Sequence, residues 1–196
     1  MKKMLITGFD PFGGESINPA WEAVKRLPDT VGEWMLAKME IPTVYGRAAQ
    51  QVLAKADETE PDVILCIGQA GGRKAITPEM VGINLRYARI ADNAGNQPQD
   101  EPVVQGAPAA YFATVPVRRM TQAIEEAGLP AAVSYSAGTF VCNDTLYTLL
   151  HHYEGTPVRA GFVHVPFLPE QAKEGVPSME LEDIVRGLEA MIKGME

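Results

Sequence analysis

The residue best placed to do chemistry is Cys142, which follows a loop and precedes a helical pattern. Gly138 permits a sharp bend before it, and Leu146, Leu149 and Leu150 recur at helical spacing after it. We therefore expect Cys142 where a loop becomes the first turn of a helix. Unpaired N–H groups and the helix dipole stabilise an anion there, so they should lower the thiol pKa and accommodate an oxyanion. The alternative interpretation is a buried, small apolar side chain.

A thiol nucleophile needs a base, and histidine suits this role at neutral pH. His151 and His152 lie about 14 Å from Cys142 along the expected helix, at about 1.5 Å per residue, so neither can reach the thiol. His164 lies near the carboxyl end of an expected strand, 159–165, at the sheet edge where the loop before Cys142 should also lie. We predict His164 as the base; a hydrogen-bonded core histidine is the alternative.

A carboxylate would orient the imidazole and stabilise the imidazolium. Three acidic residues are candidates, namely Glu79, Asp92 and Asp144. Asp144 falls in the first turn of the expected helix, where a carboxylate mostly serves the helix dipole, and we discount it. Glu79 follows a proline at the start of an extended segment, where a solvated loop charge is the alternative role. The residues alone do not choose between Glu79 and Asp92.

The second cysteine, Cys66, lies within the apolar strand pattern 63–67 and is expected to be inert, because burial among aliphatic side chains raises a thiol pKa. The apolar run at the N-terminus is too short for a signal peptide, and the chain has two cysteines. Together these observations indicate a reducing compartment, so we expect a cytoplasmic protein without a disulfide. No CxxC, HExxH or clustered His and Cys ligands are present, so no metal and no cofactor is predicted.

An aromatic loop follows the first expected strand, 3–8. Phe9 and Phe12 are constrained there by proline and glycine, at the kind of sheet edge where open α/β proteins bind ligands. They either line a small apolar pocket or close the end of the core. A second glycine-rich loop, 68–73, lacks the spacing of dinucleotide and P-loop motifs. Its glycines instead allow the backbone or the Gln69 amide to approach a ligand.

Strand patterns alternate with helical ones along the chain, which predicts an α/β fold of three layers, α/β/α, around a mostly parallel or mixed sheet. A single domain over residues 1–196 accounts for the length. Beyond the segments named above, we expect strands over 33–41 and 76–89, a long loop over 91–109, and helices over 19–27 (capped by Asn18), 44–57 (capped by Thr43), 116–128 and 179–193 (capped by Ser178).

The composition is that of an ordinary globular protein, with 46% hydrophobic and 21% charged residues. A formal net charge of −8 and scattered basic residues oppose binding to nucleic acid or to an anionic membrane surface. No apolar run approaches the roughly 20 residues of a membrane span. Composition thus favours an ordinary globular protein and opposes these two classes of partner.

Five sequence blocks, in order along nearly the whole chain, resemble the motifs of type I pyroglutamyl peptidases, also called pyrrolidone carboxyl peptidases. They are Gly8-Phe9-Asp10-Pro11-Phe12-Gly13-Gly14; Gly68-Gln69-Ala70-Gly71-Gly72-Arg73 with Thr77-Pro78-Glu79; Ala88-Arg89-Ile90-Ala91-Asp92-Asn93; Ser136-Ala137-Gly138-Thr139-Phe140-Val141-Cys142-Asn143; and Val163-His164-Val165-Pro166-Phe167-Leu168-Pro169. Five ordered matches are far more specific than any single motif.

The resemblance implies a cysteine exopeptidase that removes an N-terminal pyroglutamyl residue from peptides through a thioester. By this resemblance Cys142 is the nucleophile, His164 the general base and acid, and Glu79 the orienting carboxylate. It also implies that Arg89 lies at the oxyanion or near the nucleophile. The implied substrate pocket comprises Phe9, Phe12, Asn18, Gln69, Arg89, Phe140 and Val141.

An ordinary aminopeptidase must hold a free ammonium group, usually with carboxylates or metals. These residues offer aromatic rings, an amide and backbone groups instead, which suit an uncharged lactam. Members of this family commonly form symmetric oligomers, so the resemblance implies a homotetramer or homodimer, with the loop 91–109 as a candidate contact. The competing hypothesis is a non-catalytic or phosphorylase-like α/β protein that binds a small ligand through its glycine loops. It predicts indifference to alkylation of Cys142.

Overall fold

Six strands form one twisted sheet at the centre of the computed structural model, which describes residues 1–196. Their order is β2-β3-β1-β4-β8-β5. The strands are β1 (Lys2–Phe9), β2 (Thr30–Val31), β3 (Trp34–Ile41), β4 (Val63–Gln69), β5 (Thr77–Pro78) and β8 (Arg159–Val165). The four inner strands pair in parallel, and the short β2 and β5 close the two edges in antiparallel fashion.

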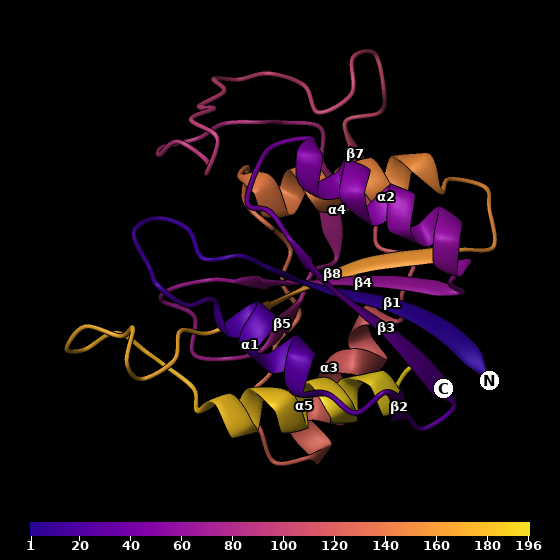
Figure 1. Cartoon of the computed structure of the whole chain (residues 1–196), viewed down its shortest axis with the longest axis vertical. Coiled ribbons are helices and arrows are strands. Elements are labelled where there is room, and N and C mark those ends of the chain that lie inside the picture. The colour runs from indigo at the N-terminus through magenta and orange to yellow at the C-terminus, as the bar shows by residue number, and fades with distance from the viewer.

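Five helices cover the sheet and complete three layers, which confirms the predicted α/β class. They are α1 (Pro19–Arg26), α2 (Arg47–Thr59), α3 (Val117–Glu126), α4 (Val141–His152) and α5 (Leu181–Lys193). Figure 1 shows α2 and α4 on one face and α1, α3 and α5 on the other. Each face buries its own apolar cluster against the sheet, and burial of this kind is the main force that stabilises such a fold. None of these helices is both long and apolar enough to cross a bilayer.

The apolar strands lie where an uninterrupted hydrophobic pattern predicts them. β1, β4 and β8 are flanked by strands on both sides and covered by helices on both faces, so nearly all of their residues are buried. Asn18 caps α1 as expected, because its side-chain oxygen accepts the N–H of Ala20 at 3.0 Å. These local signals place α1, α4 and β8 within one or two residues of the prediction.

The expected strand over 76–89 is wrong as a single element. Its start forms β5 at the edge of the main sheet, and its middle forms β6 (Val81–Ile83), which pairs with β7 (Ala110–Phe112) in a separate two-stranded sheet. Glu79 lies at the break, where its N–H donates to the carbonyl oxygen of Phe162 at 2.9 Å. The alternating pattern predicted extended backbone correctly but carried no signal for the change of partner.

Two predicted helix caps are also wrong. Helix α2 begins at Arg47 behind Gly46, because the N–H of Thr43 donates to the Asp10 carboxylate at 2.7 Å and holds Thr43 in the preceding loop. Helix α5 begins at Leu181, since the N–H of Met179 donates to the carbonyl oxygen of Phe167 and so extends the loop past Ser178. Tertiary hydrogen bonds thus override the local capping signals.

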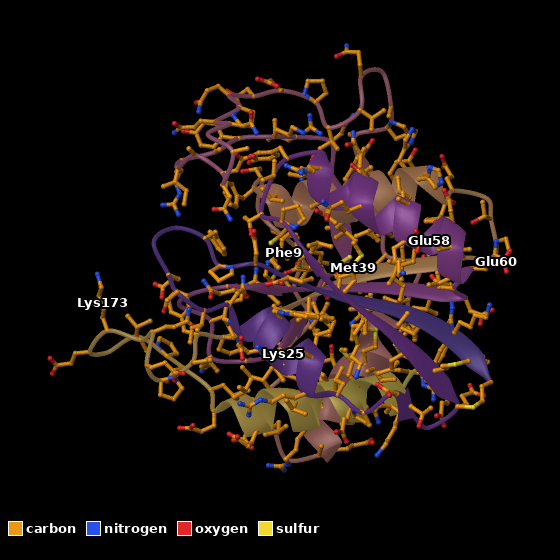
Figure 2. The ribbon with its side chains drawn as sticks, viewed as in Figure 1. Phe9, Lys25, Met39, Glu58, Glu60 and Lys173 are labelled. Carbon is orange, nitrogen blue, oxygen red and sulfur yellow. The ribbon has the colours of Figure 1, made fainter.

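The region between β6 and β7 contains the long loop expected over 91–109, which forms no helix or strand. In Figure 1 this part of the chain extends beyond the layer formed by α2 and α4. Asn84 fixes one end of it by exchanging hydrogen bonds with the backbone of Val104. In Figure 2, Lys173 marks a second projecting loop, between β8 and α5, while Phe9 lies inside the molecule.

Candidate active site

Cys142 is the second residue of α4, as the sequence predicts. Gly138 adopts a φ of +74°, a left-handed conformation that favours glycine, and so makes the bend that precedes the helix. Phe140 then takes the N-cap position in an extended conformation, and no side chain caps this end of the helix. The N–H groups of the first turn are therefore available to an anion beside the Cys142 thiol.

The sulfur of Cys142 lies against the backbone of Gly68, near the end of β4. A Cβ built on Gly68 would be only 3.0 Å from this sulfur and 2.8 Å from the Phe162 ring. Gly68 is also the register partner of His164 on the neighbouring strand β8. Because partners in a parallel pair point to the same face, the thiol and the imidazole lie on the same side of the sheet.

The imidazole of His164 is buried and paired with Glu79. Its Nδ1 lies 2.7 Å from Glu79 Oε1, and the Glu79 side chain is completely buried. The short strand β5 creates this contact, since Thr77 pairs with His164 and so places Glu79 beside β8. A carboxylate at Nδ1 fixes the tautomer that carries a proton there and leaves Nε2 to accept one. The geometry joins Glu79 rather than Asp92 or Asp144 to His164.

Charge and burial act against each other at this pair. Burial raises the pKa of Glu79, but the hydrogen bond and charge of His164, with the cation of Arg73, outweigh it and hold the pKa below its usual value. Burial lowers the pKa of His164, and Glu79 only partly opposes this. The resting pair is therefore an ionised carboxylate and a neutral imidazole at neutral pH.

The expected lowering of the Cys142 thiol pKa is wrong in direction. Burial, with the nearby negative charge of Glu79 as the next cause, raises the pKa of Cys142 to about 12. The backbone N–H of Cys142 acts in the opposite direction, as the helix argument requires, but its effect is smaller. The thiol consequently keeps its proton at rest, and a base must remove that proton during the reaction.

Substitution of Gly68 by alanine tests the contact between sulfur and sheet. The added methyl group would lie 3.0 Å from the Cys142 sulfur and closer still to Phe162, so the sulfur or the ring must shift. We expect kcat/KM to fall about 100-fold, because a displacement of about 1 Å at a reacting atom has an effect of that size. Steady-state kinetics measures it, with Gly187→Ala on α5 as the control, since a Cβ there also meets a core side chain, Ile76, but on the other face of the sheet from Cys142. Equal activity of Gly68→Ala and wild type would contradict this placement.

Three of the predicted pocket residues meet at one cavity beside the loop that leads to Cys142. Phe12, Arg89 and Phe140 line a cavity of about 370 Å³, together with Tyr87, Ile90 and residues 137–139. The rings of Phe12 and Phe140 lie 5.9 Å apart. Arg89 is exposed, and no protein group accepts a hydrogen bond from its guanidinium. An apolar wall with one free cation at its rim can enclose a small uncharged ring and still bind a polar group outside it.

The other four predicted pocket residues do not line this cavity. Phe9 is 1% exposed and packs against Phe162, and Val141 is fully buried. Asn18 is committed to capping α1 and to a hydrogen bond with the carbonyl oxygen of Asp10, so it supports the loop that carries Phe12. Gln69 accepts a hydrogen bond from Gln171 at 2.9 Å and follows Gly68, so its side chain leaves the opposite face of β4.

The residues that follow Cys142 have a role that the sequence analysis missed. Asn143 and Asp144 are both completely buried. The Asn143 amide bonds the backbone of Ile83, and the Asp144 carboxylate accepts Arg86 Nε at 2.6 Å and the Gly46 N–H at 2.8 Å. Asp144 therefore serves tertiary contacts, which its position in the first turn of the helix does not indicate.

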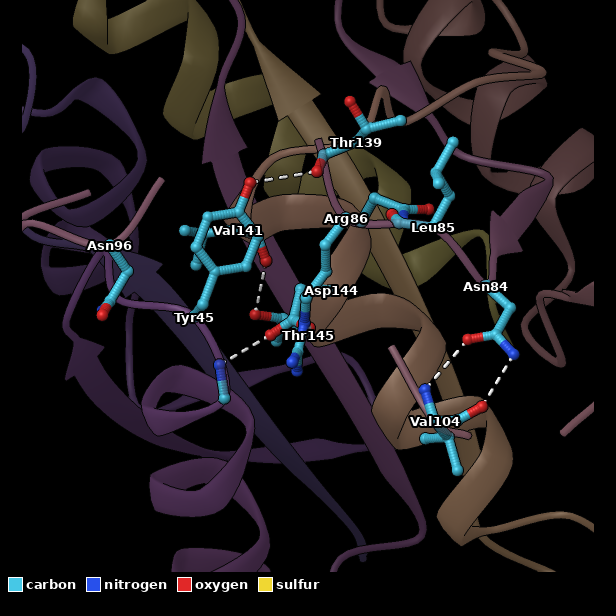
Figure 3. A network of polar contacts seen from close by, with 12 residues as sticks. Tyr45, Asn84, Leu85, Arg86, Asn96, Val104, Thr139, Val141, Asp144 and Thr145 are labelled. Carbon is cyan, nitrogen blue, oxygen red and sulfur yellow. Dashed lines mark hydrogen bonds and ion pairs between the residues drawn. The ribbon is translucent and has the colours of Figure 1, made fainter. Parts of the chain in front are cut away.

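Figure 3 shows Asp144 and Arg86 of this network near Thr139, whose carbonyl oxygen accepts the hydroxyl of Tyr45 at 3.0 Å. The contacts tie the loop before Cys142, helix α2 and the segment after β6 to the start of α4. They fix the approach to the nucleophile without touching it.

No group of three or more His, Cys, Asp or Glu side chains is arranged to hold a metal ion.

Comparison with known proteins identifies the family. The family model described as pyroglutamyl peptidase matches residues 2–196. The chain belongs to the pyroglutamyl peptidase family. A pyrrolidone-carboxylate peptidase of Levilactobacillus brevis is 53% identical, with 98% of this chain and 97% of the relative covered, and one of Bacillus thuringiensis is 50% identical, with 98% and 92% covered.

Solved structures agree with this assignment. The pyroglutamyl peptidase I of Bacillus amyloliquefaciens superposes with a TM-score of 0.96 at 46% identity, covering 100% of this chain and 97% of that one. The pyrrolidone carboxyl peptidase of Thermococcus litoralis has a TM-score of 0.94 at 39% identity, with 100% and 93% covered. Membership of the pyroglutamyl peptidase family confirms a hydrolase of the cysteine peptidase type, and the competing hypothesis of a non-catalytic or phosphorylase-like binder is not favoured.

Proposed function

We propose that this protein, acting as one domain over residues 1–196, removes the N-terminal pyroglutamyl residue of peptides with Cys142, His164 and Glu79 as its catalytic triad. The observation that carries the proposal is the buried pair of His164 and Glu79, whose Nδ1 and Oε1 atoms lie 2.7 Å apart. His164 is the register partner of Gly68, the glycine against which the Cys142 sulfur lies. Family membership supports the substrate, because the relatives named above are pyrrolidone-carboxylate and pyroglutamyl peptidases.

The first half of the reaction forms a thioester. His164 Nε2 takes the proton of the Cys142 thiol as the sulfur attacks the carbonyl carbon of the pyroglutamyl residue. The N–H groups at the start of α4 hold the oxygen that becomes negative. Glu79 stabilises the imidazolium that forms. The C–N bond then breaks, and His164 gives its proton to the departing amine.

The second half releases the product. Water enters beside the thioester and loses a proton to His164 Nε2 as it attacks the same carbonyl carbon. The C–S bond breaks, the sulfur recovers the proton from His164, and pyroglutamic acid leaves. Because burial lowers the pKa of His164, the base stays neutral down to mildly acidic pH, and activity should fall only when the pH drops below that lowered pKa.

The cavity beside the loop that leads to Cys142 suits the lactam ring. Its aromatic wall, Phe12 and Phe140, can cover the flat faces of the ring, and no carboxylate lines it to attract a free ammonium. Phe9, Val141, Asn18 and Gln69 then act by supporting that wall and the strand ends. Hydrolysis of a pyroglutamyl anilide tests this proposal, with the corresponding prolyl anilide as control. We expect turnover of the lactam substrate alone; comparable turnover of both would contradict it.

Alkylation offers a second test of how the thiol is activated. Since the pKa of Cys142 is raised to about 12, its reaction with iodoacetamide near neutral pH should depend on proton transfer to His164. Inactivation of the wild type should rise with pH and level off once His164 is neutral. In His164→Ala the rate should be lower and keep rising with pH, because only hydroxide then removes the proton.

The site of modification decides the outcome of that experiment. Peptide mapping should find the label on Cys142 and not on Cys66, which is fully buried and whose pKa is also raised to about 12. Cys66→Ala is the matched control and should be inactivated like the wild type. Equal inactivation rates and pH profiles for His164→Ala and wild type would show that His164 is not the base.

We further propose that the protein acts in the cytoplasm as a homodimer or homotetramer. Both cysteines are free, which suits a reducing compartment. Several large apolar side chains away from the cavity are exposed and favour self-association, namely Met35, Phe112 and Tyr135. Light scattering at micromolar concentration should give two or four times the chain mass, and a monomer would contradict this proposal.

A further inference from the structure

Arg73 holds three groups that belong to two different parts of the active site. It follows the glycine-rich turn after β4, and its side chain is 29% exposed. One guanidinium nitrogen donates to Glu79 Oε1 at 2.8 Å and to the Thr77 hydroxyl at 2.6 Å. The other donates to the carbonyl oxygen of Ser136 at 3.1 Å.

Ser136 begins the loop that runs through Gly138 to Cys142. A single guanidinium therefore ties the carboxylate that orients His164 to the segment that presents the nucleophile. We propose that Arg73 is a positioning residue of the peptidase, which sets the Glu79 carboxylate and the loop before Cys142 in one arrangement. This proposal rests on the function proposed above, because it assumes that Glu79 and His164 act on Cys142.

Arg73 also completes the charge arrangement around the imidazole. The charged groups that act on the His164 imidazole are Glu79 on the segment after β5 and Arg73 on the turn after β4, and the thiol of Cys142 lies on the same side of the sheet. The hydroxyl of Ser134 lies beside Glu79 but donates to the Ser136 carbonyl oxygen at 3.2 Å. His164 and Arg73 thus share one oxygen, Oε1, and Oε2 has no hydrogen-bond partner.

The cation has a definite effect on the base. Positive charge at Arg73 lowers the pKa of His164 and that of Glu79. Loss of this charge should let the pKa of His164 rise, because Glu79 would then stabilise the imidazolium without a competing cation. The imidazole would be protonated at a higher pH, so it would cease to accept the thiol proton there.

A purely structural ion pair would behave differently, and the chain contains a matched example. Arg86 is 23% exposed and pairs with the completely buried Asp144 at 2.6 Å, much as Arg73 pairs with Glu79. Both arginines are partly exposed and pair with a buried carboxylate, but Arg86 does not contact Glu79, the carboxylate that is bound to His164. Arg86→Gln therefore controls for the general effect of breaking such a pair.

The test measures the protonation of His164 directly. Nuclear magnetic resonance titration of the imidazoles in a Cys142→Ala background follows His164, with His151 and His152 as internal references. In Arg73→Gln the pKa of His164 should rise by about half a unit or more, since a neighbouring charge shifts a pKa by an amount of this order. Arg86→Gln should leave it unchanged.

Kinetics of the same substitutions with Cys142 intact supplies the second readout. For Arg73→Gln the acid limb of kcat/KM should move to higher pH by the same amount, and kcat should fall about tenfold with little change in KM, as for lost orientation at the reacting groups. Arg73→Lys keeps the positive charge, but lysine cannot hold all three acceptors as the guanidinium does. It should therefore keep the wild-type pKa of His164, and its kcat should lie between those of wild type and Arg73→Gln.

The outcomes separate the two proposals. An unchanged His164 pKa and an unchanged kcat in folded Arg73→Gln would overturn the role of Arg73 even if the wild type hydrolyses the pyroglutamyl anilide. If Arg73→Gln does not fold, wild-type kcat in Arg73→Lys would overturn it instead. If the wild type hydrolyses no pyroglutamyl substrate, the proposed function fails, while the His164 titration still reports whether Arg73 controls that imidazole.

Discussion

Replacement of Cys142 by alanine should reduce kcat/KM for a pyroglutamyl anilide by about 10⁴-fold or more, because loss of a nucleophile leaves only binding and oxyanion stabilisation. Serine at this position should be nearly as inactive, since its hydroxyl is a weaker nucleophile than sulfur and meets the same buried surroundings. Cys142 is half-buried at the start of α4 and packs on Gly68, so neither substitution removes a large core contact. Unfolding temperatures should therefore change little.

Cys66 provides the matched control for this experiment. It lies on β4, is completely buried, and is surrounded by the sheet and the helices that cover it. Cys66→Ala should lower the unfolding temperature, because it leaves a small cavity, while kcat stays within about twofold of wild type. Retention of activity in Cys142→Ala, or its loss in a folded Cys66→Ala, would reassign the nucleophile.

The second large effect is expected for Glu79→Gln. Glutamine keeps the size of the side chain and an oxygen for His164 Nδ1 and Arg73, but it removes the negative charge that stabilises the imidazolium in both halves of the reaction. We expect kcat to fall by about 10²- to 10⁴-fold with a small change in KM, the pattern of an interaction made mainly in the transition state. Steady-state kinetics near pH 7 measures it.

Asp144→Asn is the control for removing a buried carboxylate. Asp144 is as buried as Glu79 and also binds an arginine, but it holds the loops around α4 and does not contact the imidazole. This substitution should lower the unfolding temperature and reduce kcat by less than about tenfold, because only positioning is disturbed. If kcat fell as much in Asp144→Asn as in Glu79→Gln, the charge of Glu79 would have no role in catalysis beyond that of a buried structural carboxylate.

The main layers of the fold follow from local patterns in the sequence. The buried strands β1, β4 and β8 are apolar throughout, and Asn18 with the proline after it marks the start of α1 without ambiguity. These signals depend only on neighbouring residues. The structure of the segment from β5 to β6 depends instead on which strand each end pairs with, β8 for β5 and β7 for β6. Thr43 and Ser178 do not cap helices, because contacts with residues distant in the sequence hold their segments in loops.

The candidate site was predictable to the extent that residue type and strand order determine it. Cys142 and His164 follow from a thiol at a helix start and a histidine at a strand end, whereas the choice of Glu79 over Asp92 came from the family resemblance. The thiol pKa was predicted in the wrong direction, because burial is a property of the assembled site. The contacts of Arg73 and Asp144 could not be predicted for the same reason, since their partners lie far away in the sequence.

The most direct test of the central claim, a pyroglutamyl thioester on Cys142, is a partitioning experiment with hydroxylamine. Pyroglutamyl substrates with different leaving groups, an anilide and a peptide, are hydrolysed at the same hydroxylamine concentration, and the hydroxamate and free acid are quantified. A shared thioester predicts one ratio of the two products for both substrates, because the leaving group has departed before water or hydroxylamine attacks. A ratio that changes with the leaving group would show that water attacks the substrate directly and would contradict this account.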